Sequence, residues 1–248
     1  MSATTVDWLR EQHECSSLEV RLLGVVDYDS AAALQDRLHA EIAERSDRLG
    51  ALVICEHPPV VTVGREGGGD RVGLIRDELA ARLIDLRWVA RGGGTLMHLP
   101  GQLVVYPIVP LSRLSISVVE FRRRLLSSLI AVCRDQRVDA WDGPDGQSVR
   151  CRLGRIASVG VAVRDHVTFH GMFLNVNPNP NLLQLMQATS IAGRLTSLSS
   201  QRMSPVSMQA VRESTIRHLA EMLGYSEWNV YTGHPLLRRD QKKVYDYA

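Results

Sequence analysis

The sequence lacks the cysteine patterns that mark zinc sites and disulfide frameworks. Its four cysteines, Cys15, Cys55, Cys133 and Cys151, show no CxxC spacing, and no His-x-x-x-His pattern accompanies them. Neither a structural zinc site nor a set of disulfides is therefore expected. We interpret Cys55 and Cys133 as buried apolar residues of the core.

Long hydrophobic runs and a strong charge of either sign are also missing. No apolar run approaches the roughly 18 residues of a membrane-spanning helix, and the N-terminus lacks the pattern of a secretory signal peptide. The formal net charge of +2 implies neither nucleic acid nor an anionic membrane as a partner. We expect a soluble, cytoplasmic protein, and nothing in the sequence implies a metal or an organic cofactor.

Lysine is nearly absent. Lys242 and Lys243 are the only two in the chain, and every other basic residue, histidine aside, is arginine. A reaction that requires lysine has no candidate before residue 242.

The hydrophobic pattern predicts an α+β fold, with a mixed sheet and flanking helices. Buried strands are expected at 51–55, 60–63 and 102–108, and the apolar runs 155–164 and 167–175 are typical of a hairpin. Turns or loops are expected at 64–69, 143–147 and 177–181.

Three helices are expected, and two of them have a serine as the expected cap. Ser30 is expected to cap a helix to about residue 45, and Ser207 one to about residue 223. The third covers about 117–137. The inward residues of the three helices are expected to be Leu34, Leu38, Ile42, Val118, Phe121, Leu125, Leu129, Val132, Val211, Ile216, Leu219 and Leu223.

A glycine-rich segment, RGGGTLMHLPGQ from Arg91 to Gln102, is the first candidate for chemistry. Its three glycines permit close approach of the backbone and exposed amide donors, and Arg91 and His98 flank them. Such a loop suits an acyl carbonyl or a phosphate. A plain turn between two strands explains the glycines equally well.

Five segments in collinear order carry a more specific signal. They are EHPPVVTVGR (56–65), RGGGTLMHLPGQLVVYP (91–107), GRIASVGVAVR (154–164), VTFHGMFLNVN (167–177) and TSIAGRLTSL (189–198). In order and spacing they resemble the blocks of the octanoyl-/lipoyl-transferase family of lipoate synthesis.

The resemblance implies the catalytic-domain fold of the biotin and lipoate protein ligases, as one domain over residues 1–248. Family members move an octanoyl group from acyl carrier protein to a lysine of a lipoyl domain through a cysteine thioester. A nearby lysine lowers the pKa of that cysteine. Octanoyl-acyl carrier protein and lipoyl-domain proteins are the implied partners.

The resemblance also assigns site residues. Thr189 occupies the position of the family's nucleophilic cysteine, and Arg155 that of its lysine. The implied substrate-binding residues are Arg91, Gly92, Gly93, Gly94, Thr95, Leu96, Met97, His98, Ser158, Val159, Gly160, Gly171, Met172 and Phe173. Within this loop Met97 replaces a tyrosine of the family and Leu99 replaces a glycine.

Both catalytic substitutions change the chemistry. Arg155 keeps a positive charge but cannot act as a base at neutral pH. The hydroxyl of Thr189 is a weak nucleophile unless a base removes its proton. Cys151 is an alternative nucleophile, since it would share a face with Arg155 if both lay on one strand.

Three hypotheses remain open at this point. The chain is an acyltransferase with a weak or relocated nucleophile, a pseudoenzyme that binds an acyl chain or a lipoyl-domain or carrier partner, or a transferase for another acyl group. An adenylating ligase is disfavoured because its usual lysine is absent.

Overall fold

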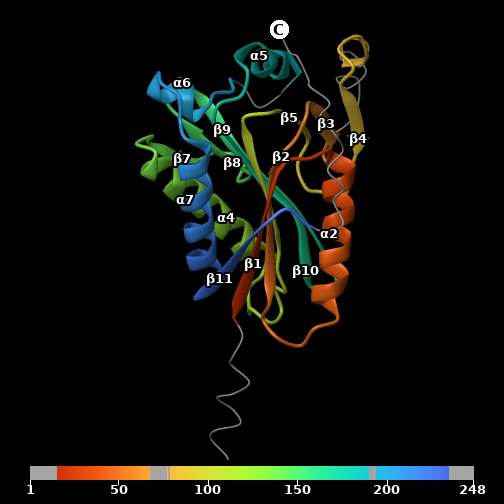
Figure 1. Ribbon diagram of the computed structural model, residues 1–248. Coiled ribbons are helices and arrows are strands. Elements are labelled where there is room, and N and C mark those ends of the chain that lie inside the picture. The colour runs from red at the N-terminus through yellow and green to blue at the C-terminus, as the bar shows by residue number, and fades with distance from the viewer. Residues whose placement is uncertain (1–15, 68–76, 78, 190–193, 235–248) are drawn as a thin grey trace, which may run out of the picture.

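A computed structural model describes residues 16–67, 77, 79–189 and 194–234, with the side chains of 185–189 left out. Within these residues no helix is long and apolar enough to cross a lipid bilayer. Two sheets and their covering helices form the architecture (Figure 1).

In the described part of the chain, the main sheet has eight strands in the order β11-β1-β2-β6-β10-β9-β8-β7, and a second sheet has the order β4-β3-β5. Strand β1 is parallel to β2 and to β11, whereas β6, β7, β8, β9 and β10 pair antiparallel. This mixed sheet confirms the α+β prediction. The strands are β1 (Ser17–Val25), β2 (Gly50–Glu56), β3 (Val60–Val63), β4 (Asp85–Trp88), β5 (Thr95–His98), β6 (Gln102–Ile108), β7 (Ala140–Asp142), β8 (Ser148–Cys151), β9 (Gly154–Arg164), β10 (Val167–Asn175) and β11 (Glu227–Thr232).

The predicted hairpin is formed by β9 and β10. Asp165 and His166 connect them, and both have positive φ, at 50° and 60°. A two-residue connection with two positive φ values matches the right-handed twist of the flanking strands.

Helix α2 covers one face of the main sheet, and α4 and α7 cover the other (Figure 1). Ser207 is the N-cap of α7, as predicted, and Ser117 is the N-cap of α4. The predicted cap of the first helix is wrong, because the Asp27 carboxylate accepts from the Ser30 amide at 2.8 Å and caps α2 three residues earlier. The helices are α2 (Tyr28–Ala43), α4 (Val118–Asp135), α5 (Pro180–Thr189), α6 (Leu198–Arg202) and α7 (Met208–Leu223).

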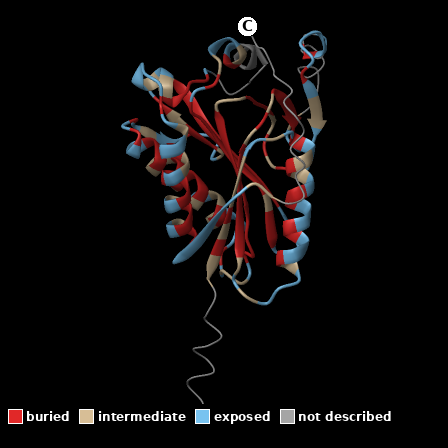
Figure 2. Ribbon diagram, viewed as in Figure 1, coloured by how far each residue is buried: buried red, intermediate tan, exposed pale blue. Residues whose placement is uncertain are grey.

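The core is divided by the main sheet into two apolar clusters, and Figure 2 shows the sheet buried along most of its length. The predicted inward residues are buried except Val118, which is 46% exposed near the start of α4. A third cluster joins the small sheet to α5 and contains Val61, Leu79, Ile84, Met97, Leu99, Leu183 and Leu195. Cys55 and Cys133 are buried, as predicted.

Several elements were not expected from the sequence. Residues 17–25 and 227–232 form β1 and β11, and the glycine-rich segment ends in β5. The loop expected at 177–181 ends early, because α5 begins at Pro180. Proline is well suited to the first turn of a helix, where its missing amide costs nothing.

Candidate functional site

A small cavity lies between the start of α2, strand β5 and the side of the main sheet that α2 covers. Its volume is about 20 Å³, which is room for one water-sized group. The lining residues are Tyr28, Arg91, Leu96, His98, Val104, Tyr106, Ser158, Gly160, His170, Gly171, Met172 and Phe173.

The cavity brings together three segments that are far apart in the sequence. Of the predicted binding residues, those that line it are Arg91, Leu96, His98, Ser158, Gly160, Gly171, Met172 and Phe173. Those that do not are Gly92, Gly93, Gly94, Thr95, Met97 and Val159. Within β5 and β9, alternation explains the division, since Met97 and Val159 face apolar clusters on the opposite sides of these two strands.

Arg91 is held in place by backbone and hydroxyl oxygens. Its guanidinium donates to the Thr62 carbonyl at 2.9 Å, to the Thr62 hydroxyl at 2.8 Å and to the Gly92 carbonyl at 3.0 Å. Burial lowers the pKa of Arg91 to about 10, so it remains a cation at neutral pH. None of the described residues that line the cavity carries a carboxylate, so this charge gives the cavity positive character.

The glycine loop is fixed by its own hydrogen bonds. The amide of Gly92 donates to the Val161 carbonyl, and that of Gly93 donates to the Glu66 carboxylate, each at 3.0 Å. These two amides are therefore used within the protein, contrary to the expectation that they face a ligand. Gly160 permits this packing, because a Cβ atom there would lie 2.8 Å from the Gly92 carbonyl oxygen.

Four lining residues carry buried polar atoms that have no hydrogen-bond partner within the described residues: Arg91 Nε, His98 Nδ1, Ser158 Oγ and His170 Nδ1. A buried polar group without a partner costs about 1–3 kcal/mol. Such groups at one small cavity suit a ligand with a polar end, such as a carbonyl oxygen.

A neutral histidine orients one wall of the cavity. His57 Nδ1 donates to the Val26 carbonyl at 2.7 Å, so Nε2 carries the lone pair and accepts from the Tyr106 hydroxyl at 2.8 Å. Burial lowers the pKa of His57 to about 4, which keeps this tautomer neutral. The Tyr106 oxygen therefore has its proton engaged by His57 and offers lone pairs at the cavity.

The other two imidazoles of the site are neutral as well. Burial lowers the pKa of His98 well below its usual range and lowers that of His170 to about 4, with Arg91 adding to both effects. His170 has a φ of 56°, uncommon for a residue other than glycine. Its amide donates to the Gln35 side chain at 2.8 Å.

Tyr28, Val104, Tyr106 and His170 line the cavity but were not among the predicted binding residues. Tyr106 and His170 lie inside the family-like segments, so they could have been found by following every polar residue of those segments. Tyr28 lies outside them, and its sequence context carries no such signal.

Arg155, predicted to occupy the position of the family's lysine, lies near the start of β9 and is 7% exposed. Its amide donates to the Arg194 carbonyl at 2.8 Å, and its carbonyl accepts from the Thr196 amide at 2.9 Å. These bonds join β9 to the segment that follows α5. Thr189 is the last residue of α5, and its side chain lies outside the described part of the structure.

Cys151 and Arg155 do not share a strand. Cys151 ends β8, Arg155 belongs to β9, and Arg155 pairs with Arg150. The Cys151 thiol is buried in the core, donates to the Gly154 carbonyl at 3.4 Å, and has a pKa raised by burial. The premise that placed this thiol beside Arg155 is therefore wrong, and its environment opposes a thiolate.

Comparison with known proteins matches residues 27–220 to the lipoyl protein ligase A/B catalytic domain. An octanoyltransferase of Geotalea uraniireducens is 38% identical over 72% of this chain and 80% of its own. One from Azotobacter vinelandii is 35% identical over 86% of this chain and 95% of its own.

A solved archaeal lipoate protein ligase, from Thermoplasma acidophilum, superimposes with a TM-score of 0.66 at 18% identity, covering 88% of each chain. This likeness confirms the ligase-type fold. The chain belongs to the lipoyl protein ligase A/B catalytic-domain family and, within it, to the family of the proteins named octanoyltransferase.

Proposed function

We propose that this chain is an acyltransferase of lipoate synthesis, which moves an octanoyl group from acyl carrier protein to a lysine of a lipoyl domain. The observation that carries the proposal is the cavity, where segments from three parts of the chain place unpartnered polar atoms around one small volume. The octanoyltransferase names of the relatives support the acyl group.

The proposed reaction has two acyl transfers. The Thr189 oxygen attacks the thioester carbonyl, its proton passes to a neutral imidazole, and the carrier thiol leaves with a proton. The acceptor amine then attacks the threonyl ester, forming the amide and restoring the hydroxyl. Arg155 supplies positive charge near the developing oxyanion, and His98 or His170 is the proton acceptor.

An eight-carbon chain exceeds a cavity of about 20 Å³, so lining side chains must move when the substrate binds. Met172 and Phe173 are the apolar side chains from β10 at this wall. Methionine has three rotatable bonds and repacks readily, so we propose that Met172 opens the path for the chain.

A second candidate is a pseudoenzyme that binds the acyl chain or the partner domain without turnover. It is favoured by the substitution of both catalytic positions and by the burial of Cys151, the alternative nucleophile considered from the sequence.

The two candidates differ in the mass of the protein after incubation with octanoyl-acyl carrier protein. A transferase gains an octanoyl adduct that apo lipoyl domain removes, and Thr189→Ala abolishes it. Thr232→Ala, in an exposed strand, is the matched control that keeps the adduct. If neither adduct nor modified lipoyl domain forms while octanoate binds, the enzyme is excluded and the pseudoenzyme remains.

Restoration of the family residues provides a test of the scaffold itself. The double variant Thr189→Cys with Arg155→Lys is expected to form a thioester adduct faster than the unmodified chain, because a thiolate next to a cation is the better nucleophile. No gain, with octanoate binding unchanged, would mean that the cavity does not present the acyl group to residue 189.

A further inference from the structure

Positive charge is concentrated in one stretch of this chain. Residues 146–212 contain seven arginines and a single carboxylate, Asp165, whereas the whole chain has 29 basic and 27 acidic residues. Asp165 follows the last residue of the 11-residue strand β9, so it lies far from Gly154, the first residue of that strand. Asp145, just before the stretch, has its carboxylate engaged by the Ser148 hydroxyl at 2.8 Å.

The fold gathers arginines at the end of the sheet where β9 begins. Arg152 lies in the two-residue turn between β8 and β9. The carbonyl of Arg194 accepts from the Arg155 amide at 2.8 Å, and a Cβ atom at Gly154 would lie 3.3 Å from the Cβ of Arg194. Arg152 and Arg194 are therefore neighbours on this end of the molecule.

Helix α6 adds a third arginine to the same end. The Thr196 amide donates to the Arg155 carbonyl at 2.9 Å, and the Thr196 hydroxyl accepts from the Gln201 side chain at 3.2 Å. Arg202 is the last residue of α6, and Met203, which follows it, is 91% exposed. Figure 1 shows α5, α6 and the start of β9 at the same end of the molecule. We call Arg152, Arg194 and Arg202 the basic surface.

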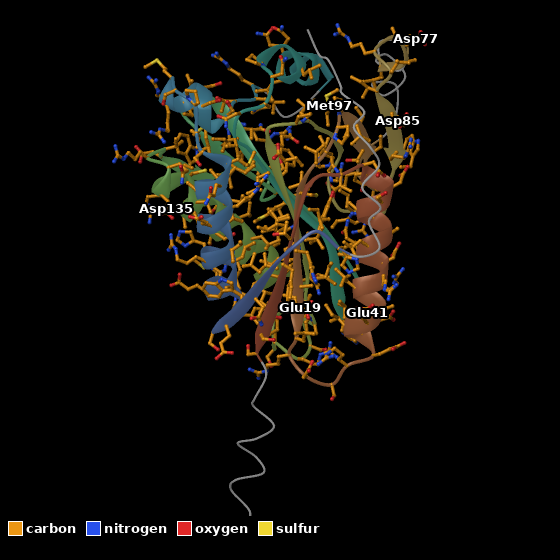
Figure 3. The ribbon with its side chains drawn as sticks, viewed as in Figure 1. Glu19, Glu41, Asp77, Asp85, Met97 and Asp135 are labelled. Atoms are coloured by element: carbon orange, nitrogen blue, oxygen red, sulfur yellow. The ribbon has the colours of Figure 1, made fainter. Side chains whose placement is uncertain are left out.

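The basic surface is not neutralised by the described part of the chain. Its three arginines are exposed, and none forms an ion pair with a described residue. By contrast, Arg164 and Arg212 of the same stretch pair with Asp36 and Glu56. Figure 3 shows other carboxylates, such as Glu19 and Glu41, towards the opposite end of the molecule. Exposed charge of one sign attracts a partner of the opposite sign.

We propose that the basic surface docks a carboxylate-rich face of the acyl carrier protein that delivers the octanoyl thioester. This inference rests on the proposed function and adds where the donor binds. The surface adjoins both predicted catalytic positions, because Arg194 is bonded to Arg155 and helix α5 ends at Thr189. A carrier held there has its thioester arm next to the residues that would receive the acyl group.

Charge selects the acyl donor over the acceptor. The acceptor presents a lysine, which is a cation at neutral pH, and three arginines repel it. The carrier holds its thioester on an arm that contains a phosphate, so its approach is favoured by the same charges. The lipoyl domain is therefore expected to approach the site from outside the basic surface.

Binding of octanoyl-acyl carrier protein to the full chain, followed by fluorescence anisotropy without lipoyl domain, tests the surface apart from transfer. We expect the dissociation constant to rise with salt, because salt screens exposed charges. Arg152→Glu should raise it several-fold, and Arg152→Glu with Arg202→Glu roughly tenfold or more. Arg48→Glu, at an exposed arginine before β2 without an ion pair to a described residue, is the matched control and should bind normally.

A conservative variant separates charge from structure. Arg152→Lys with Arg202→Lys keeps both charges and should keep the affinity, since an exposed surface attracts its partner through charge. Loss of affinity in this variant as large as in the glutamate variant would overturn the proposal. So would binding that responds neither to salt nor to the glutamate substitutions.

Steady-state transfer distinguishes this proposal from the proposed function. The double glutamate variant should raise the KM for the carrier and leave the KM for the lipoyl domain unchanged. Transfer with an unchanged carrier KM would overturn the docking surface and leave the proposed function standing. Carrier binding that the double variant weakens, in a chain that transfers nothing, would support the surface and refute the proposed function alone. Weakened binding of the lipoyl domain instead of the carrier would overturn the choice of partner.

Discussion

Acid is expected to destabilise this fold well above the pH at which carboxylates titrate. His57 and His170 are buried, and burial holds the pKa of each at about 4, whereas an imidazole of an unfolded chain titrates near ~6.5. Between these values the unfolded chain binds more protons than the folded chain, so stability falls as the pH falls. Their contribution is complete above about pH 6.5 and is lost progressively towards about pH 4.

The magnitude follows from the two pKa values. Moving from about pH 8 to about pH 5 costs roughly 2 kcal/mol for each imidazole, or about 4 kcal/mol for the pair. His98 acts in the same direction, because burial also lowers its pKa. A domain of this kind has about 5–15 kcal/mol of total stability, so the loss is a large fraction of it.

Urea unfolding measured at several pH values between about 5 and 8 checks this prediction. Carboxylates such as Asp29 and Asp135, whose pKa is lowered, stay ionised throughout this pH range. His170→Asn suits the positive φ at that position and should reduce the loss of stability by about 2 kcal/mol. His166→Asn, in the exposed hairpin turn, should leave it unchanged. An identical pH dependence in His170→Asn and the unmodified chain would refute the reasoning.

Three further predictions concern packing and capping. Leu99→Ala should lower the free energy of unfolding by about 2–5 kcal/mol, because Leu99 is fully buried. Its control, Leu83→Ala at a residue 93% exposed, should change it by less than about 0.5 kcal/mol. Equal losses for the two variants in urea unfolding would contradict this. Gly160→Ala should weaken octanoate binding, since its Cβ would lie 2.8 Å from the Gly92 carbonyl, while Gly92→Ala, with 3.5 Å to its nearest neighbour, should bind normally in calorimetry. Asp27→Ala should lower the free energy of unfolding by about 0.5–2 kcal/mol, because Asp27 is the N-cap of α2, and Ser30→Ala should lower it by far less. A larger loss for Ser30→Ala than for Asp27→Ala in thermal unfolding would identify Ser30 as the cap.

The fold was predictable from the sequence where the spacing of apolar residues and the turn-forming residues indicate the same element. The strand Gln102–Ile108 and the hairpin around Asp165 have both signals, and both are confirmed. Strands β1 and β11 were missed because their exposed faces carry mixed polar and apolar residues, which give no clear period. Strand β5 was missed because the glycines before it suggest a loop, although its pairing with β3 makes Thr95–His98 extended.

The site was predictable only as far as the family-like segments reach. They identify Arg91, His98 and the strand residues around Gly160 and Gly171, which line the cavity. They do not say which side of each strand faces the cavity, so Met97 and Val159 were included although they face away. Tyr28 enters through the packing of α2 on the sheet, a contact between segments that no local pattern encodes.

One apolar cluster connects the glycine-rich loop to α5 and to the segment that is bridged to Arg155. Met97 and Leu99, which the resemblance places where the family has a tyrosine and a glycine, do not line the cavity. Both belong to the cluster that contains Leu183 of α5 and Leu195, and Figure 3 shows Met97 beside the small sheet, below α5.

Residues in contact respond to substitution as a unit rather than one by one. Leu183 belongs to α5, which ends at Thr189, and Leu195 forms a bridge with Arg155, so the cluster contacts elements that carry both predicted catalytic positions. We therefore expect a substitution at residue 99 to alter the packing of α5 and of the segment bridged to Arg155, through Leu183 and Leu195 rather than through the cavity.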